Sequence, residues 1–374
     1  MFIDIVAGAR PNFVKIASII SAISAAQQNG SNIRYRLVHT GQHYGPEMSD
    51  NFFRDLQIPW PHVDLGVGSA SPATQAGLIM MGYEKLLLTE KPDLTLVVGD
   101  VTSTMACAVV AKKMGVKLAH LEAGLRSFDM KMPEEVNRMV TDAISEYFFT
   151  TSATACDNLL NTGISEDRIF FVGNTMIDTL LKFEGQFRKP KLCDELNLTQ
   201  KKYIVLTLHR PGNVDDIQQL KTLIEYIDAN VRNTPVVFPL HPRTALVLQQ
   251  AGLATKHLHI VGPLGYLEFN HLVKNAMAVI TDSGGVSEET TVLNVPCLTV
   301  RSNTERPETV ELGTNMLVGE CLEDMGTALD TLFKGEWKTG NIPELWDGKA
   351  GERAVAILGR LLQHHKNKHE TLVS

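Results

Sequence analysis

Residues 278–289 read AVITDSGGVSEE, and this stretch decides how the rest of the chain is interpreted. A short apolar run comes first, then Asp-Ser, then a glycine pair, and then a polar, acidic run. This order predicts a buried strand, a tight turn and the start of a helix. The backbone N–H groups of Ser283, Gly284 and Gly285 would then face an anion such as a diphosphate. Glu289, one turn later, is a candidate acceptor for ribose hydroxyls.

The same strand-then-helix pattern recurs along all 374 residues. Most apolar runs are nearly continuous, which is typical of strands buried on both faces of a parallel sheet. Their alternation with helical patterns predicts a doubly wound α/β fold. The expected strands are Phe2–Ala7, Arg34–Thr40, Leu94–Asp100, Lys117–Glu122, Tyr147–Thr151, Ile169–Val172, Tyr203–His209, Val236–His241, Leu258–Val261, Ala278–Thr281, Cys297–Val300 and Met316–Val318. Two sets of six strands predict two Rossmann-like domains with a boundary near Gly173, since one core rarely serves so long a chain.

Composition narrows the function classes. Hydrophobic residues make up 44% and the net charge is -7, so neither disorder nor a nucleic-acid partner is expected. The five cysteines are scattered without CxxC spacing, which argues against a disulfide framework or a zinc site. No leader-like segment and no apolar run of membrane-spanning length is present, so we expect a cytoplasmic protein without a membrane partner.

The first predicted strand ends in a turn that suits an anion. GARPN, residues 8–12, follows the strand, and Lys15 stands one turn into the next helix. Pro11 fits a first helical turn, where its missing N–H is not needed. Arg10 and Lys15 are candidate anion ligands beside the positive end of that helix, or simply solvated cations. The turn lacks GxGxxG, so no NAD cofactor is expected.

Three acidic residues mark the first half. Asp100 and Glu122 each end a predicted strand, and Glu134 lies in the first turn of a predicted helix. Because parallel strands end at one edge of their sheet, we expect the three carboxylates to converge on one cleft, where they suit proton transfer. The structural alternative is that Asp100 caps the next helix and that Glu134 pairs with Arg138 at i,i+4.

Basic residues follow strands in the second half. His209 and His241 each end a predicted strand, and an arginine follows each of them closely. Two such histidines indicate a rim that faces phosphate, whereas a lone one is more often structural. Arg306, in the segment TERPE at 304–308, offers one more cation.

The motifs described above and their neighbours are more specific for a protein family together than any one of them is alone. GxRP with its lysine, VVGD, HxEAGLR, PEExNR, HR…N, DSGG…EE and TERPE follow one another between Gly8 and Glu308. Together they resemble the non-hydrolysing UDP-N-acetylglucosamine 2-epimerases. The resemblance implies the GT-B architecture: α/β, with two Rossmann-like doubly wound parallel-sheet domains facing a central cleft, usually as a homodimer. It implies a first domain of residues 1–172 plus a returning C-terminal helix, 353–374, and a UDP-binding second domain of residues 173–352.

The resemblance also implies the chemistry. A base removes the C2 proton of the UDP-sugar while UDP leaves C1 in an anti elimination, and 2-acetamidoglucal is the intermediate. UDP then adds back as C2 is reprotonated on the other face. No cofactor and no metal take part, and the product serves cell-surface polysaccharide biosynthesis.

Site residues carry over by motif position. Asp100, Glu122 and Glu134 resemble the catalytic carboxylates, and His209 resembles the histidine that handles the departing phosphate. The substrate contacts implied are Arg10, Lys15, Arg138, Phe269, Ser283, Gly284, Gly285, Glu289 and Arg306. Two departures stand out: HRPGN replaces the family's HRREN at 209–213, and Leu264 replaces a glutamine near the uracil.

Other functions share parts of this pattern. A GT-B glycosyltransferase would use the same UDP site without the carboxylate cluster. A hydrolysing relative would release N-acetylmannosamine, and a C2 epimerase of a 2,3-diacetamido uronic acid would act on a modified sugar. A nucleotide-sugar sensor would keep the DSGG loop without chemistry.

Activation by substrate at a second site, known in bacterial relatives, is expected to be weak here. The family's TAQH motif ends differently, with Tyr44 after His43, and Thr74 stands where an arginine is expected. Pro211 replaces a second arginine, so two cations that would hold an activating diphosphate are missing.

Overall fold

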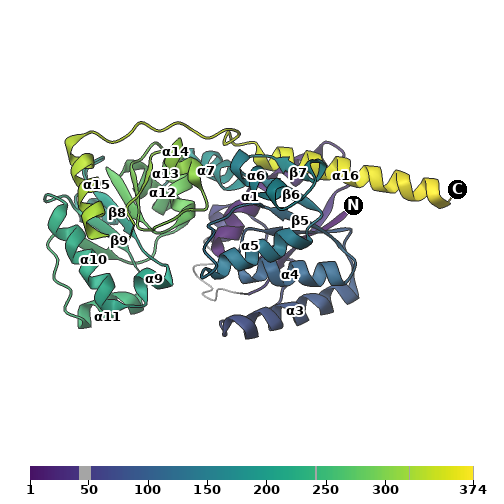
Figure 1. Ribbon diagram of the computed structural model, residues 1–374, viewed down its shortest axis with the longest axis horizontal. Helices are drawn as coiled ribbons and strands as arrows, with labels where there is room; N and C mark the ends of the chain where they lie inside the picture. The colour runs from purple at the N-terminus through teal and green to yellow at the C-terminus, as the bar shows by residue number, and fades with distance from the viewer. Residues whose placement is uncertain (42–51, 241, 320, 374) are drawn as a thin grey trace. The chain divides into compact units, whose positions relative to one another are not determined.

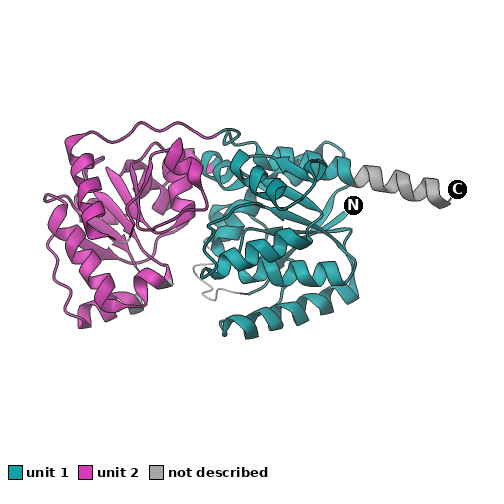
Figure 2. Ribbon diagram, in the orientation of Figure 1, with its two compact units in different colours: residues 1–182, 344–374 teal, residues 183–343 magenta. Residues whose placement is uncertain are grey.

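The computed structural model describes residues 1–41, 52–240, 242–319 and 321–373. Two compact units make up the chain, unit 1 with residues 1–182 and 344–374 and unit 2 with residues 183–343 (Figure 2). Gln42, His43 and Tyr44 of the activator hypothesis and His241 of the expected phosphate rim lie outside the described residues.

Unit 1 is built around a parallel sheet in the order β3-β2-β1-β4-β5-β6-β7 (Figure 1). Its strands are β1 Phe2–Ala7, β2 Arg34–His39, β3 Val63–Asp64, β4 Leu94–Val98, β5 Lys117–Leu121, β6 Tyr147–Thr150 and β7 Ile169–Phe171. Its helices are α1 Arg10–Gln28, α3 Pro72–Thr89, α4 Thr102–Lys113, α5 Pro133–Ile144, α6 Ala153–Asn161, α7 Thr175–Phe183, whose last residue opens unit 2, and α16 Ala350–Val373, with the 3-10 turn η1 Glu166–Arg168.

Unit 2 repeats the plan with the strand order β10-β9-β8-β11-β12-β13. Its strands are β8 Ile204–Thr207, β9 Val236–Pro239, β10 Leu258–Val261, β11 Ala278–Thr281, β12 Cys297–Thr299 and β13 Asn315–Leu317. Its helices are α8 Leu192–Glu195, α9 Pro211–Val214, α10 Ile217–Asn230, α11 Pro242–Gln250, α12 Tyr266–Asn275, α13 Gly284–Val292, α14 Pro307–Glu311 and α15 Leu322–Lys334, with the 3-10 turn η2 Glu184–Gln186.

Both sheets are covered on both faces, as the continuous apolar runs predict. Ile204 and Leu206 of β8 pack with α10 and α15, whereas Val205, between them, packs with Leu272 of α12. Successive strand residues point to opposite faces, so each face of the strand needs its own helical cover. The order of strands reverses direction between β1 and β4, and again between β8 and β11. Crevices at such switch points are where doubly wound sheets bind ligands.

The expected strands are confirmed with two differences. The short strand β3 was not expected, because two residues carry no readable pattern. Several expected strands also run too far at their carboxyl ends: Asp100 and Glu122 lie beyond β4 and β5. Gly99 and Glu122 adopt left-handed backbone angles, φ +65° and +69°, which end an extended strand.

Unit 1 extends ten residues beyond the expected boundary at 172, because α7 packs on its helices. Thr179 donates a hydrogen bond to the carbonyl oxygen of Val14 in α1 (2.7 Å). Asp178 accepts hydrogen bonds from Ser18 of α1 and from the backbone N–H groups of Ala350 and Gly351 at the start of α16.

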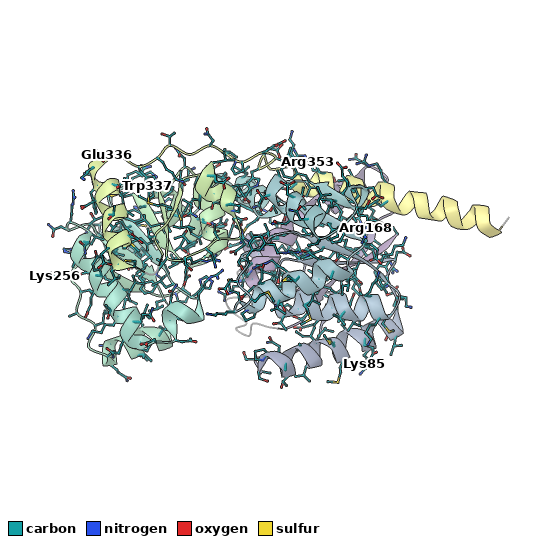
Figure 3. The ribbon with its side chains drawn as sticks, in the orientation of Figure 1. Lys85, Arg168, Lys256, Glu336, Trp337 and Arg353 are labelled. Carbon is teal, nitrogen blue, oxygen red and sulfur yellow. The ribbon has the colours of Figure 1, made fainter. Side chains whose placement is uncertain are left out.

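The chain rejoins unit 1 at residue 344 rather than at the expected 353. Trp346 is buried and donates to the carbonyl oxygen of Thr151 (3.0 Å), which ties the segment before α16 to the end of β6. Arg353 of α16, labelled in Figure 3, donates to the carbonyl oxygen of Val172 (3.0 Å). No helix of the described residues is both long enough and apolar enough to span a bilayer.

Candidate active site

The turn after β1 is fixed by Asn12, which sequence analysis quoted but did not single out. Its Oδ1 accepts hydrogen bonds from the backbone N–H groups of Gly8 (3.1 Å) and Ala9 (3.0 Å). Its Nδ2 donates to the carbonyl oxygen of Val98 at the end of β4 (3.0 Å). Asn12 therefore joins the two strand ends of the switch point in unit 1. Arg10, at the first position of α1, stays exposed to solvent.

Lys15 forms a buried ion pair with Glu122. Their side chains are 8% and 5% exposed, so the lysine is not a solvated cation but the charge partner of a predicted catalytic carboxylate. Gly99 packs against both groups, since a Cβ there would lie 3.3 Å from Lys15 Nζ and from Glu122 Oε2. Three strand ends or turns, after β1, β4 and β5, therefore meet at this pair.

Asp100 is joined to α5 rather than capping the helix after it. Its carboxylate forms an ion pair with Arg138, and its carbonyl oxygen accepts from Asn137 Nδ2 (2.8 Å). The N-cap of α4 is Val101, without a side-chain bond. Arg138 is almost fully buried and also binds Glu135 through Nη2 (2.6 Å). The ion pairs of Arg138 thus run to Glu135 and Asp100, where the i,i+4 spacing had favoured Glu134.

Glu134 lies in the first turn of α5 and is half-buried. It precedes Arg138 by one helical turn, and Arg138 contacts Asp100. Unit 1 therefore brings Asp100 to α5, the helix that carries Glu134, and brings Glu122 to α1. Convergence of all three carboxylates on one cleft stays a prediction.

In unit 2, His209 is held by Asp282, a residue that sequence analysis quoted but did not assign. Nδ1 of His209 lies 2.7 Å from Asp282 Oδ1, and the His209 ring is largely exposed. The backbone N–H groups of His209 and Arg210 and the amide of Asn213 also donate to this fully buried carboxylate. Burial raises the pKa of Asp282, but His209 and these hydrogen bonds outweigh it and lower the pKa to about 2. Asp282 thus stays ionised and orients the histidine, with Nε2 as its other proton-exchanging atom.

The glycine-rich turn is confirmed as the start of a helix. Ser283 is the N-cap of α13, and its hydroxyl accepts from the N–H of Val286 (3.5 Å). The N–H of Ser283 itself donates to Thr281 Oγ1 (3.0 Å). An anion at this turn would therefore have to share or displace the Ser283 N–H bond, while Gly284 and Gly285 supply the first helical N–H groups.

Arg306 lies against Gly284 as part of a buried ionic cluster. A Cβ on Gly284 would lie 2.6 Å from Arg306 Nη1. Nε of Arg306 is 2.6 Å from Glu288, and Nη1 donates to Glu305 (2.6 Å). Burial raises the pKa of Glu305, but Arg306 and Arg301 outweigh it and hold that pKa well below its usual range. Arg306 is therefore a charge fixed beneath the turn, and its contact with a nucleotide-sugar stays a prediction.

Glu289 is buried behind the same turn. Its Oε1 accepts a hydrogen bond from the hydroxyl of Tyr266 (3.0 Å). Burial raises the pKa of Glu289 to about 7, and the bonds from Tyr266 and Asn270 counter only part of that rise. Phe269 lies on α12, as Tyr266 does, and is partly buried against the core. Among the described residues, no group of three or more His, Cys, Asp and Glu side chains is arranged to hold a metal.

The chain is similar to known proteins over nearly its whole length. The family model for UDP-N-acetylglucosamine 2-epimerase matches residues 25–359. The UDP-N-acetylglucosamine 2-epimerase of Methanocaldococcus jannaschii is 42% identical over 96% of this chain and 99% of that protein. A UDP-2,3-diacetamido-2,3-dideoxy-D-glucuronate 2-epimerase of Pseudomonas aeruginosa is 41% identical over 95% of this chain and 98% of that protein.

Solved structures similar to this chain point to the same family as its sequence relatives. The M. jannaschii enzyme in complex with UDP-GlcNAc and UDP superimposes with a TM-score of 0.85, over 96% of this chain and 99% of that one. The S. aureus MnaA–UDP structure has a TM-score of 0.86 at 28% identity, over 97% of each chain. Two doubly wound parallel-sheet units with these neighbours are the GT-B architecture. From its sequence relatives and from its fold, the chain belongs to the UDP-N-acetylglucosamine 2-epimerase family.

Proposed function

We propose that this chain inverts C2 of UDP-N-acetylglucosamine and so forms UDP-N-acetylmannosamine. The observation that carries the proposal is the full-length similarity, at 42% identity, to an enzyme with that name. The arrangement of unit 1 adds support, because buried Glu122 packs beside Gly99 at the end of β4 and half-buried Asp100 follows that glycine. That donor set suits the exchange of a carbon-bound proton.

The proposed reaction is an anti elimination followed by re-addition. A carboxylate of unit 1 takes the proton from C2, the C1–oxygen bond breaks, and UDP leaves with the bonding electrons. The intermediate is 2-acetamidoglucal. UDP then attacks C1 again while a second carboxylic acid delivers a proton to the opposite face of C2. Asp100, Glu122 and Glu134 are the proposed proton-transfer groups.

The residues of unit 2 are proposed to hold and stabilise the departing UDP. The first turn of α13 supplies backbone N–H groups, and the His209–Asp282 pair supplies a proton-exchanging nitrogen beside them. Fixed dipoles and cations aimed at the leaving group lower the barrier more than solvent does, because they need no reorganisation. Arg10, Phe269 and Glu289 complete the proposed contacts to phosphate, uracil and ribose.

A second substrate is supported by a specific observation. The relative that acts on a UDP-2,3-diacetamido-2,3-dideoxy-D-glucuronate is 41% identical, nearly as similar as the first relative. The C2 chemistry would be the same, and only groups at C3 and C6 would differ. We therefore propose this sugar as the alternative substrate of the same site.

Proton NMR in D2O tests the reaction. We expect the signal of UDP-N-acetylmannosamine to appear after UDP-N-acetylglucosamine is added, with deuterium entering C2 of both sugars. The diacetamido uronate is tested in parallel, and the faster exchange identifies the substrate. C2 protons that persist in both sugars through a long incubation would disprove the epimerase proposal, and free N-acetylmannosamine would indicate a hydrolysing enzyme instead.

We propose a homodimer in the cytoplasm that needs neither metal nor nucleotide cofactor and that contributes to cell-surface polysaccharide biosynthesis. Support for the dimer comes from α3, where Leu78, Met81 and Leu88 are 42%, 61% and 72% exposed. Their spacing puts them on one stripe of the helix, and contiguous exposed apolar surface is typical of protein interfaces.

From the raised pKa of Glu289 we expect binding of the UDP-sugar to weaken at acid pH. Its pKa is raised to about 7, so the carboxylate is lost as the pH falls through neutrality. A carboxylate accepts ribose hydroxyls with both oxygens, whereas the acid form must place its own proton. We expect the Kd of UDP-N-acetylglucosamine to rise up to about tenfold per pH unit below about pH 7, measured by calorimetry.

The Glu289→Gln variant is the control for this pH dependence. It should bind more weakly than the wild type at pH 8 and lose the slope on the acid side. The UDP-sugar is the right probe because its diphosphate has no group that titrates near pH 6, unlike UDP. An unchanged slope in the variant would assign the titration to another group.

A further inference from the structure

His120 is buried behind the predicted carboxylates and belongs to none of the roles described so far. It lies in β5, two residues before Glu122, and is fully buried. Its Nδ1 lies 2.7 Å from Asp142 Oδ1 of α5, and its Nε2 lies 2.8 Å from the carbonyl oxygen of Gly99. The ring therefore bridges the end of β4 to α5.

Both partners of the His120 ring are hydrogen-bond acceptors. A carbonyl oxygen only accepts, so Nε2 must carry a hydrogen. The carboxylate of Asp142 lies 2.6 Å from Arg126 Nη1 and accepts a hydrogen bond from the N–H of Gly124, so it is ionised and also only accepts. Nδ1 must then carry a hydrogen as well. With two N–H donors the ring is an imidazolium cation.

The cation is part of a buried cluster that ties strand ends together. Asp142 also accepts from the N–H of Gly124 (3.2 Å) and lies 2.6 Å from Nη1 of Arg126, both just beyond Glu122 in the chain. Two positive charges thus share one carboxylate in the interior. The Lys15–Glu122 pair also lies close to Gly99, since a Cβ there would be 3.3 Å from Lys15 Nζ and from Glu122 Oε2. The groups that face the ring and its partners are thus Asp142, Arg126, Lys15 and Glu122.

The Gly99 carbonyl belongs to the peptide that joins Gly99 to Asp100. Gly99 has φ +65°, and its N–H donates to the carbonyl oxygen of Leu121 (2.9 Å). The bond from His120 restrains this peptide on the strand side, while Asn137 and Arg138 hold Asp100 on the side of α5. Glycine backbones turn easily, so a bond to the carbonyl oxygen of Gly99 limits the freedom of that peptide.

We propose that His120 is a positioning residue, an imidazolium that orients the Gly99–Asp100 peptide and thereby Asp100 for proton transfer. The inference rests on the proposed function, because Asp100 is placed in the catalytic machinery there. It assigns His120 no contact with substrate. Proton transfer to carbon tolerates little error in distance, and a displacement of about 1 Å can cost 10²-fold in rate.

The protonation state is tested in the wild-type protein by NMR of histidine labelled with ¹⁵N. At pH 8, one histidine should show both ring nitrogens in the protonated range, with slowly exchanging protons because the ring is buried. A spectrum in which every histidine has an unprotonated ring nitrogen at pH 8 would overturn the proposal. This measurement does not depend on activity, so it stands apart from a failure of the epimerase assay.

Function is tested with His120→Gly and added imidazoles. We expect kcat to fall about 10²-fold, with KM for the UDP-sugar within about threefold of the wild type. Imidazole, which becomes a cation with two N–H donors, should restore much of kcat. 1-Methylimidazole, which has one N–H donor as a cation, should restore little.

A matched control separates positioning from loss of stability. Tyr83 is fully buried in the same unit and bonds to Asp4 and Thr95, away from the strand ends that carry the carboxylates. Tyr83→Phe should lower the thermal stability and leave kcat unchanged. If His120→Gly does not fold, His120→Leu, which has no hydrogen-bond donor, replaces it, and a kcat within threefold of wild type would overturn the proposal. Equal rescue by the two imidazoles would do the same.

Discussion

Turnover is expected to fall by about 10²-fold or more when Asp100, Glu122 or Glu134 is replaced by its amide. The amide keeps the shape of each side chain and removes its ability to take up and release a proton. UDP-sugar binding should persist, because the proposed UDP contacts are Arg10 and residues of unit 2, none of which is changed. The measurement is kcat with UDP-N-acetylglucosamine, beside the rate at which deuterium enters C2. Near-normal turnover in all three variants would remove the carboxylates from the mechanism.

Glu122→Gln needs a control of its own. The change leaves Lys15 buried without its charged partner, which destabilises the fold as well as the chemistry. The double variant Lys15→Met, Glu122→Gln removes the unpaired charge and should recover thermal stability without recovering turnover. Glu146→Gln serves as the matched carboxylate, because Glu146 accepts from the N–H of Leu118 near the amino end of β5. Its turnover should match that of the wild type.

Gly284→Ala is expected to weaken the binding of UDP on the order of 10²-fold. The added Cβ would lie 2.6 Å from Arg306 Nη1 and 3.0 Å from Glu305 Oε1. Arg306 is buried and holds both Glu305 and Glu288, so it does not swing aside without breaking ion pairs. The first turn of α13 must shift instead. Two charge-assisted hydrogen bonds lost at about 1.5 kcal/mol each correspond to that factor.

The control for Gly284→Ala is a glycine with room for a methyl group. Gly185 lies in η2 of the same unit, and a Cβ there would meet no atom within 4 Å. Gly185→Ala should leave the Kd of UDP and the unfolding temperature unchanged. A Gly284→Ala protein that stays folded and binds UDP normally would show that the start of α13 does not hold the diphosphate.

The strands could be predicted because a buried strand is recognisable from its own residues. A strand covered on both faces is apolar at every position, and such runs as Leu94–Val98 stand out from their surroundings. The residues at which the strands end could not be predicted equally well, because Glu122 adopts a left-handed conformation that is uncommon for glutamate. The unit boundary at residue 182 could not be predicted from the sequence, because α7 joins unit 1 through contacts with α1 and α16, which lie far away in the chain.

The candidate site also contains residues that the sequence predicts and residues that it does not. Residues at strand ends, such as Asp100 and His209, could be named because parallel strands deliver their carboxyl ends to one edge. Their partners could not. Asp282 holds His209 across 73 residues, and Lys15 meets Glu122 across the turns after three strands.

The sequence by itself therefore determined the fold class, the family and the residue types at the switch points, because these depend on local pattern and motif order. Only the tertiary structure decided which charges pair. It placed Lys15 and Arg306, both predicted substrate contacts, as buried partners of Glu122, Glu288 and Glu305. It also made His120 a bridge between two acceptors. The reason is physical: the strength of an ion pair or hydrogen bond depends on distance and burial, and both are set by the order of strands in the sheet.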